Sequence, residues 1–408
     1  MSDLALLGGP QAKTKPFPAW PVYDDRERQA LSDVLESGIW WRTPGKQTLR
    51  FEQRFAQAHG ARHGIAVTNG TAALEVVMLA LGIQPGDEVI VPDYTFFATA
   101  SAVLCAGALP VMVDILPDTS CLDPDLVAAA ITPRTKAIVA VHLGGHPADL
   151  DALGALAKQH GLPLVEDCAH AHGSAWRGQP VGSHGIAGTF SFQMGKLMTA
   201  GEGGIVVTND DAFERAARSV HDCGRLPGQW FYSHFQHGSN YRLSEWQGAI
   251  LNVQLERLED QAARRHAAGR WLDERLAKLP GITPQKLDPR CTRNGQYAYI
   301  FDYDPAAHGG LPFAKFAQAV EAEGIPRQAA YPPVHALDLF RNGAYRQRLS
   351  GLQRDGDHTF LRGNFPHTVR AAERSYWVPQ TCLLGDAQDL EEIVQAIAKV
   401  ATRASELV

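Results

Sequence analysis

The sequence predicts an α/β fold with two domains, a large one over residues 23–279 and a smaller α+β one over residues 280–408. Short apolar runs alternate with helical stretches in the large domain, which is typical of a mostly parallel sheet covered by helices on both faces. A Leu-Pro-Gly turn at residues 279–281, followed by a strand-like alternation, marks the second domain. With 408 residues, 45% of them hydrophobic, the chain is long enough to build both cores.

Composition excludes several classes of function. The formal net charge of −6 offers no basic field for a nucleic-acid backbone. The sequence has neither a basic leader nor a run of about 18 apolar residues, so we expect a cytoplasmic protein that does not insert into membranes. The six cysteines lack C-x-x-C spacing, which argues against a zinc site, and we expect no metal.

The N-terminal region begins with a proline-rich arm, residues 1–22, which we expect to lie extended on the body. Asp24–Ser37 has the pattern of a helix. The loop Gly38–Gly45 that follows contains Trp40 and Trp41 between helix-breaking residues. This pair belongs either to a packed connector or to a loop that contacts substrate or a second subunit, and we favour the second interpretation.

The first strand, His63–Thr68, runs into a turn that begins a helix ending near Gly82. Gly70 and Thr71 lie where such a helix presents free backbone N–H groups, which is a common way to bind a phosphate. The turn lacks the lysine of a P-loop and the glycine pattern of a dinucleotide site. From these residues alone, a plain helix cap is an equally good interpretation.

The remaining apolar patterns complete the two predicted domains. In the second domain Tyr297–Tyr303 alternates like a strand, and Ile325–Ala330 is expected to return to the sheet. Strands of the large domain are expected at Val89–Val91, Leu109–Asp114 and Thr135–His142. Further helices are expected at Gln47–His59, Asp149–His160, Asp210–Ser219, Gly238–Leu276, Pro312–Glu323 and Asp389–Arg403.

The strongest chemical signal is Lys196. It lies on a turn between two short apolar strands, Thr189–Phe192 and Ile205–Thr208, next to a glycine cluster. Small and apolar neighbours would partly desolvate the amine and lower its pKa. Such a lysine suits the formation of a Schiff base with an aldehyde.

Asp167 is the partner we expect for this lysine. It ends a buried-type strand that begins at Leu162, and open α/β sheets bind ligands at such strand ends. If the cofactor is pyridoxal phosphate, its ring nitrogen needs an anion and its aldehyde needs a lysine. Asp167 and Lys196 would supply both groups.

Three blocks of sequence resemble the signature motifs of the DegT/DnrJ/EryC1/StrS aminotransferases. They are Glu166-Asp-Cys-Ala-His-Ala-His-Gly173, Ser191-Phe-Gln-Met-Gly-Lys-Leu-Met-Thr-Ala-Gly-Glu-Gly-Gly204 and Gly238-Ser-Asn-Tyr-Arg-Leu-Ser-Glu245. The likeness extends from about Phe17 to the C-terminal helix. It implies a fold-type-I enzyme that depends on pyridoxal 5′-phosphate. Within the family, the motifs are most similar to those of L-glutamine:scyllo-inosose aminotransferases and 3-amino-5-hydroxybenzoate synthases.

The resemblance implies roles for individual residues. Lys196 would hold the cofactor's aldehyde, Asp167 would keep its ring nitrogen protonated, and Phe96 would stack on its ring. From the residues alone, Phe96 is also a candidate for the core. His170 would touch the ring hydroxyl or the lysine loop, and His335 would contact substrate.

The resemblance also implies a shared active site. Gly70, Thr71 and Ser191 would hold the phosphate from one subunit. Asn240 would reach the same phosphate from the neighbouring subunit, although by sequence alone it is only a plausible cap residue. We therefore expect a homodimer with interfacial active sites.

The predicted function is a pyridoxal-phosphate-dependent aminotransferase that moves an amino group from L-glutamine or L-glutamate to a keto-cyclitol or keto-sugar in antibiotic biosynthesis. The alternative is a dehydratase or aromatising synthase of the 3-amino-5-hydroxybenzoate type, in which Lys196 serves as the base and water is eliminated. A cofactor-binding regulator fits poorly with an intact lysine and aspartate. Pro379 and Gln380 replace a His-His pair that both related branches carry, which leaves a different keto-sugar or keto-cyclitol open as the acceptor.

Overall fold

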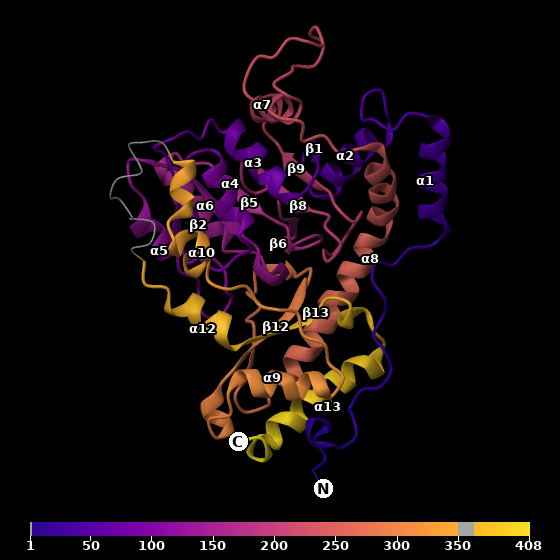
Figure 1. Ribbon diagram of the computed structural model, residues 1–408, viewed down its shortest axis with the longest axis vertical. Helices are drawn as coiled ribbons and strands as arrows, with labels where there is room; N and C mark the ends of the chain where they lie inside the picture. Colours follow the sequence, from indigo (N-terminus) through magenta and orange to yellow (C-terminus); the bar gives the residue numbers. More distant parts are fainter. Residues whose placement is uncertain (1, 350–362) are drawn as a thin grey trace.

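The computed structural model describes residues 2–349 and 363–408 (Figure 1). Its main sheet has the strand order β1-β9-β8-β5-β4-β2-β3. β9 is antiparallel to its neighbours β1 and β8, and the other neighbouring strands are parallel, so the mostly parallel α/β fold is confirmed. The strands are β1 His63–Val67, β2 Glu88–Pro92, β3 Leu109–Val113, β4 Thr135–Val141, β5 Leu164–Asp167, β8 Ala187–Ser191 and β9 Gly204–Thr208.

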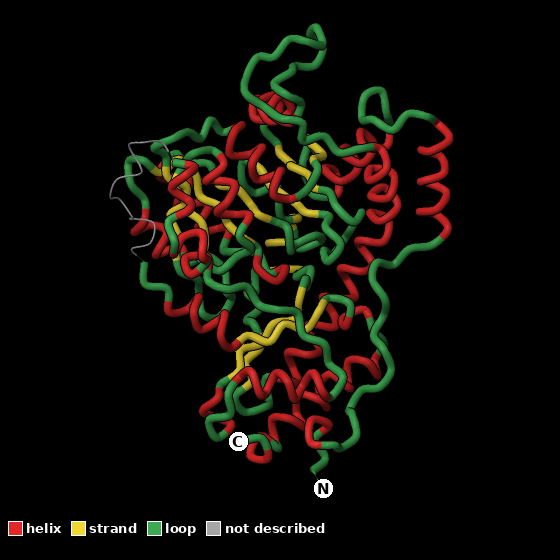
Figure 2. Tube along the Cα trace, viewed as in Figure 1, coloured by secondary structure: helices red, strands yellow, loops and turns green. Residues whose placement is uncertain are grey.

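Helices cover both faces of this sheet (Figure 2). Successive side chains of a strand point to opposite faces, so each strand serves two cores. Ile65 and Val67 of β1 pack on the side of α3, α4 and α7, whereas Ala66 packs on the side of α2, α6 and α8. These helices are α2 Gln47–Ala58, α3 Gly70–Ala80, α4 Ala98–Cys105, α6 Leu150–His160, α7 Asp211–His221 and α8 Glu245–Leu276.

A second, antiparallel sheet lies at the other end of the molecule, in the order β10-β12-β13. Helices α9 and α13 pack on it and form a third core. A small sheet of order β11-β6-β7 lies beside the main one. The elements are β6 Ala175–Trp176, β7 Gln179–Pro180, β10 Ile282–Pro284, β11 Cys291–Arg293, β12 Ala298–Tyr303, β13 Ser375–Pro379, α1 Asp25–Ser37, α5 Pro124–Ala130, α9 Phe313–Ala322, α10 Asp338–Arg341, α12 Pro366–Arg374 and α13 Ala387–Thr402.

Helix α8 connects the two ends of the molecule, as Figure 1 shows. Leu251 and Leu258 near its start lie in a core of the main sheet, and Leu272 and Leu276 near its end lie in the third core. A single helix, α8, therefore contributes to a core of the main sheet and to the third core. The predicted boundary at residue 280 stays a prediction.

The N-terminal arm lies on the C-terminal end of the chain. Leu4 is fully buried in the third core, next to the short 3₁₀ helix Ala5–Leu7. The backbone N–H groups of Ala5 and Ala12 both donate to the carboxylate of Glu323, at 2.8 and 2.9 Å. The arm is thus a structural part of that core, and its first turn is helical where we expected extended chain.

One predicted strand is wrong. Ile325–Ala330 makes a single isolated bridge, between Gln328 and Trp377. Pro326 has no N–H to donate to a ladder, which disfavours a strand there. The sheet is completed instead by β13, whose residues are buried on both faces and so lack the alternation that would have predicted it.

The start of α8 differs from the predicted one. Helix α8 begins at Glu245, seven residues after the predicted start at Gly238, because residues 238–244 pass along the main sheet as irregular chain.

Within residues 2–349 and 363–408, no helix has the length and apolar character needed to cross a membrane. The expected cytoplasmic location stays a prediction.

Candidate active site

A cavity of about 850 Å³ opens at the carboxyl-terminal edge of the main sheet. The segments that follow β1, β2, β5 and β8 line it, because the parallel strands end together at this edge. Every residue predicted to bind the cofactor contributes to its wall: Gly70, Thr71, Phe96, Asp167, His170, Ser191, Lys196 and Asn240.

Lys196 lies on the turn between β8 and β9, and its side chain is nearly buried, with 8% of the residue exposed. Its amine is 4.7 Å from the centre of the Tyr297 ring. Among the described residues the amine has neither a hydrogen bond nor an ion pair. Burial lowers the pKa of Lys196 to about 8, and the charge of Asp167 opposes this shift. The lowered pKa agrees with the sequence prediction.

Asp167 is the last residue of β5 and faces the same cavity. One carboxylate oxygen accepts the Thr99 hydroxyl at 2.9 Å, and the other accepts the Ala169 N–H at 3.1 Å. Burial raises the pKa of Asp167, while these hydrogen bonds and the charge of Lys196 oppose the rise. A cationic group beside the carboxylate would relieve the cost of its burial, which is what a protonated ring nitrogen provides.

The start of α3 forms a cradle for an anion. Asn69 caps the helix, because its side chain accepts the Ala72 N–H at 2.8 Å. The N–H groups of Gly70 and Thr71 precede the first helical hydrogen bond and remain for a ligand. A Cβ atom on Gly70 would lie 2.7 Å from Cβ of Ser191, so only glycine lets helix and strand approach this closely. The residues fit the phosphate of pyridoxal phosphate.

Aromatic rings form a further wall of the cavity. His170 stacks on Tyr297 with ring centres 3.8 Å apart and an interplanar angle of 9°. The Gly144 N–H donates to Nδ1 of His170 at 3.4 Å, so the ring proton lies on Nε2 and is donated to the Tyr331 hydroxyl at 3.0 Å. Burial, together with the charge of Lys196, lowers the pKa of His170 well below its ordinary value, and the imidazole is neutral.

Phe96 lies at the cavity and not in the core. It is 54% exposed, and its ring centre is 5.8 Å from that of Tyr331. An aromatic ring that lines a cavity with one open face is suited to stacking on a planar ligand.

Three other predicted residues lie outside the cavity wall. Trp40 packs on Trp246, with ring centres 5.5 Å apart, and Trp41 contacts Phe231 edge-on. His335 is hydrogen-bonded to a buried carboxylate. Their contact with substrate stays a prediction. Asn240 lines the cavity of its own chain, and its reach into a neighbouring subunit also stays a prediction.

Three side chains of the site were not predicted from the sequence: Thr99, Tyr297 and Tyr331. Thr99 lies one helical turn after Thr95, and their hydroxyls are 3.0 Å apart, so a polar pair on an otherwise apolar helix start was the available signal. Tyr297 and Tyr331 flank His170 but are far apart in the sequence. No local pattern identifies Tyr297. Tyr331 begins the segment Tyr331-Pro-Pro-Val-His335, which resembles a family segment that reaches into the substrate pocket, but only His335 was predicted as a contact from it.

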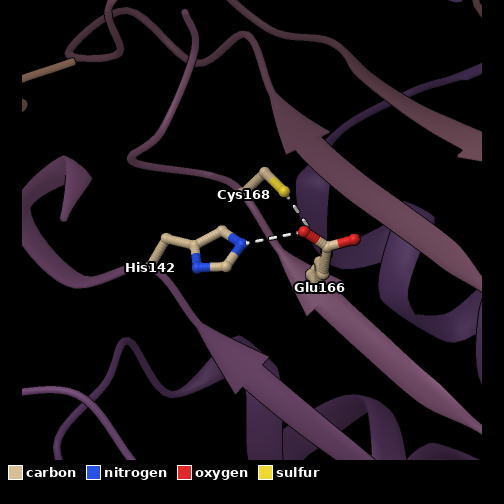
Figure 3. Close-up of side chains that lie close together, drawn as sticks. All are labelled: His142, Glu166 and Cys168. Atoms are coloured by element: carbon tan, nitrogen blue, oxygen red, sulfur yellow. Dashed lines mark hydrogen bonds and ion pairs between the residues drawn. The ribbon is translucent and has the colours of Figure 1, made fainter. Parts of the chain in front are cut away.

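Three possible metal ligands, His142, Glu166 and Cys168, lie close together near the end of β5 (Figure 3). The carboxylate of Glu166 accepts three backbone N–H groups and lies 3.2 Å from Nε2 of His142. The Ala148 N–H donates to Nδ1 of that histidine, so Nε2 carries the proton and is not free to bind an ion. Burial raises the pKa of Cys168 well above its ordinary value, which keeps the thiol protonated. The cluster therefore fits a structural role at the end of β5.

Comparison with known proteins agrees with this geometry. The chain is 40% identical to L-glutamine:2-deoxy-scyllo-inosose aminotransferase of Micromonospora echinospora, over 100% of both chains. It is 41% identical to 3-amino-5-hydroxybenzoate synthase of Amycolatopsis mediterranei, over 96% of this chain and 99% of the relative. The crystal structure of a 3-amino-5-hydroxybenzoic acid synthase superposes with a TM-score of 0.87 at 39% identity, over 96% of this chain and 100% of the other.

The family model that matches covers residues 21–398, nearly the whole chain. The likeness in sequence, the likeness in structure and the arrangement of Lys196 and Asp167 agree on the cofactor and on the class of enzyme. The chain belongs to the DegT/DnrJ/EryC1/StrS aminotransferase family and is a pyridoxal-phosphate-dependent aminotransferase of fold type I.

Proposed function

We propose that the enzyme transfers the amino group of L-glutamine to a keto-cyclitol in the biosynthesis of an aminocyclitol. The observation that supports this most directly is the cavity that joins Lys196, Asp167 and the start of α3. It occurs in a chain that aligns from end to end with an L-glutamine:2-deoxy-scyllo-inosose aminotransferase. A cyclic ketone and an amino acid would bind there in turn, each leaving before the other enters.

The side chains divide the work of the reaction. Bound here, pyridoxal phosphate supplies an aldehyde that accepts an amino group and a ring that stabilises negative charge on the adjoining carbon. Nζ of Lys196 takes the proton from Cα of the donor and later returns a proton to the acceptor carbon. A pKa of about 8 suits both steps, since the amine gains and loses a proton readily near neutral pH.

The remaining groups hold the reactants in place. The carboxylate of Asp167 retains the proton of the ring nitrogen. The N–H groups of Gly70 and Thr71, with the hydroxyl of Ser191, bind the phosphate, so the cofactor stays anchored while Lys196 is free to move protons. Neutral His170 and Tyr331 offer hydrogen bonds at the wall without adding charge.

We also propose a homodimer with shared active sites. The irregular loop after α7 extends away from the body (Figure 1) and exposes several aromatic side chains, with 72% of Trp230 accessible. Exposed aromatic clusters of this kind are typical of protein interfaces. The loop leads directly to Asn240, so a second copy seated on it would lie beside the cavity.

The second candidate is a dehydratase or aromatising synthase. It is favoured by the 41% identity with a 3-amino-5-hydroxybenzoate synthase, which is close to the 40% identity with the L-glutamine:2-deoxy-scyllo-inosose aminotransferase. In that reaction Lys196 would remove a proton and water would leave the ring, with no amino donor consumed.

The two candidates are separated by one experiment. The purified holoenzyme is mixed with L-glutamine, or with L-glutamate as the control donor, and the visible spectrum of the cofactor is followed. If the enzyme transfers the amino group, L-glutamine should abolish the visible band and release 2-oxoglutaramate. Addition of 2-deoxy-scyllo-inosose should then restore the band. A spectrum that no amino acid changes, with water eliminated from a cyclic substrate, would instead establish the synthase.

A further inference from the structure

Asp93 contacts Val334 and His335 through three acceptors, which are its two carboxylate oxygens and its backbone carbonyl. The carboxylate of Asp93 accepts the backbone N–H of His335 at 2.8 Å with one oxygen and lies 2.6 Å from Nδ1 of the same residue with the other. Its backbone carbonyl accepts the N–H of Val334 at 2.9 Å. Asp93 is fully buried, and within the described residues its carboxylate accepts no other hydrogen bond.

This contact joins two segments that are far apart in the sequence. Asp93 follows β2 directly, and three residues later the chain reaches Phe96. Four residues before His335 the chain passes Tyr331. Both aromatic rings line the cofactor cavity, 5.8 Å apart.

Other contacts also hold the segment around Tyr331: its ring packs edge-on against Trp377, with centres 5.5 Å apart, and Val334 is fully buried in the core on the α3 and α4 side of the main sheet. Upstream, Gln328 makes a single bridge to Trp377. The Tyr331 hydroxyl lies 3.0 Å from His170 Nε2, a bond that has the right length only while the segment stays in place. The Asp93 contact adds three hydrogen bonds that hold residues 334 and 335 to the end of β2, at the downstream end of this wall.

Nε2 of His335 takes no part in the contact. The ring of His335 stacks on Phe365, with centres 4.7 Å apart, and only Nδ1 faces Asp93. His335 also lies outside the cavity that holds Lys196. Its geometry suits a residue that acts through its neighbours rather than one that touches substrate.

We propose that Asp93 and His335 are positioning residues that hold the Phe96–Tyr331 wall against the cofactor. The paired hydrogen bonds set the distance between the two aromatic rings and keep the Tyr331 hydroxyl on His170. The inference rests on the proposed function only in that the cavity must bind pyridoxal phosphate, whatever ketone accepts the amino group.

The two nitrogens of the imidazole can be tested separately. The side-chain nitrogen of asparagine reaches the place of Nδ1, and that of glutamine reaches the place of Nε2. We expect the kcat/KM of His335→Asn to stay within about threefold of the wild-type value. We expect His335→Gln and His335→Ala to lose about tenfold to a hundredfold in kcat/KM, because small misplacements of bound groups have effects of this size. A residue that contacts substrate through Nε2 would give the reverse order for Asn and Gln.

Two measurements report on the wall without turnover. In the apoprotein, hydrogen–deuterium exchange over residues 331–337 should be faster in His335→Ala and Asp93→Ala than in wild type or His335→Asn. In the holoprotein, the visible circular dichroism of the bound cofactor should be smaller in the same two variants while its absorption is retained. Unchanged exchange and dichroism in both alanine variants would overturn the proposal.

A double variant tests whether the residues act together. Because both changes break one contact, Asp93→Ala/His335→Ala should lose little more than the worse single variant. Multiplied losses would also overturn the proposal. If wild-type enzyme accepts no keto-cyclitol, the proposed substrate fails, yet the exchange and dichroism results still decide the role of this pair.

Discussion

The chemistry of the cavity depends on the amine of Lys196, and its environment explains why. Burial destabilises the protonated form of this amine, and the negative charge of Asp167 offsets only part of that effect. The pKa of Lys196 is therefore about 8. Since only the neutral amine attacks an aldehyde, the reaction with cofactor should follow the deprotonation of this one group.

The first prediction concerns this titration. The rate at which apoenzyme takes up pyridoxal phosphate should rise with pH through a midpoint near 8, because the folded pKa lies below the ordinary value of 10.5. Stopped-flow absorption of the forming chromophore measures it. Lys196→Ala should show neither the visible band nor turnover at any pH, and a variant that retained both would refute the assignment.

The second prediction concerns Asp167. Asp167→Ala should still bind cofactor through the phosphate cradle yet lose about a thousandfold or more in kcat, which corresponds to about 4 kcal/mol of transition-state stabilisation. Thr99→Val is the matched milder change, since it removes one of the hydrogen bonds to that carboxylate and should cost about 1 kcal/mol. Single-turnover rates with L-glutamine distinguish them, and equal losses in both variants would contradict the ring-nitrogen role.

Sequence reasoning located these two residues because each follows a local rule. A lysine among small apolar residues and an aspartate at a strand end can both be recognised within a few neighbours. Tyr297, Tyr331 and Asp93 follow no such rule. Their positions depend on contacts between segments separated by more than 100 residues, and a pattern that is local in sequence contains no information about them.

Among the elements, the junction of β1 and α3 has the most exact requirements. The helix must begin close enough to β8 for its free N–H groups to meet an anion beside Ser191. Glycine at position 70 is what permits this approach, and Asn69, two residues after the end of β1, caps the helix.

The third prediction tests this junction. Gly70→Ala should weaken cofactor binding by about tenfold or more, because a Cβ atom 2.7 Å from Ser191 forces helix and strand apart at a cost of about 1–3 kcal/mol. Gly154→Ala in α6 is the control, since a Cβ atom there meets no neighbour within 4 Å and alanine favours the helix by about 0.5–1 kcal/mol. Cofactor titration and thermal melting separate the two, and equal cofactor affinities would count against the cradle.

Elements with regular patterns were predicted well, and those shaped by tertiary contacts were not. The helix Asp25–Ser37 and the strand His63–Val67 match their predicted places within a residue. β13 was missed because Tyr376, Trp377 and Val378 are buried on both faces. The strand was expected instead at Ile325–Ala330, which makes only the bridge between Gln328 and Trp377. Burial on two faces removes the alternation on which strand prediction relies.

At the scale of the whole molecule, the loop after α7 brings four exposed aromatic side chains together. Trp230, Phe231, Tyr232 and Phe235 are all accessible there, close to Trp41. The mostly parallel sheet and the C-terminal α+β region were predictable from the order of patterns along the sequence. A cover for the loop by a second copy, as we propose, was not predictable in detail, because such contacts would lie outside this chain.

The fourth prediction addresses assembly. Trp230→Ser/Tyr232→Ser should shift the protein from dimer to monomer, since each aromatic side chain at the centre of an interface contributes about 2 kcal/mol. Leu126→Ser, which removes an exposed apolar residue on α5, is the control and should leave the dimer intact. Light scattering across a dilution series measures the change, and a wild-type protein that is monomeric at all concentrations would rule out the shared active site.

The burial of Leu4 among side chains from the far end of the chain has a consequence for synthesis on the ribosome. Its partners in the third core include Ile393 and Val400, which are translated nearly 400 residues later. Leu4 leaves the exit tunnel long before these partners are made, so its place in the core is incomplete until they follow. A chaperone that binds nascent chains would find its target there, and fusing a partner ahead of Leu4 should delay maturation more than fusing it behind α13.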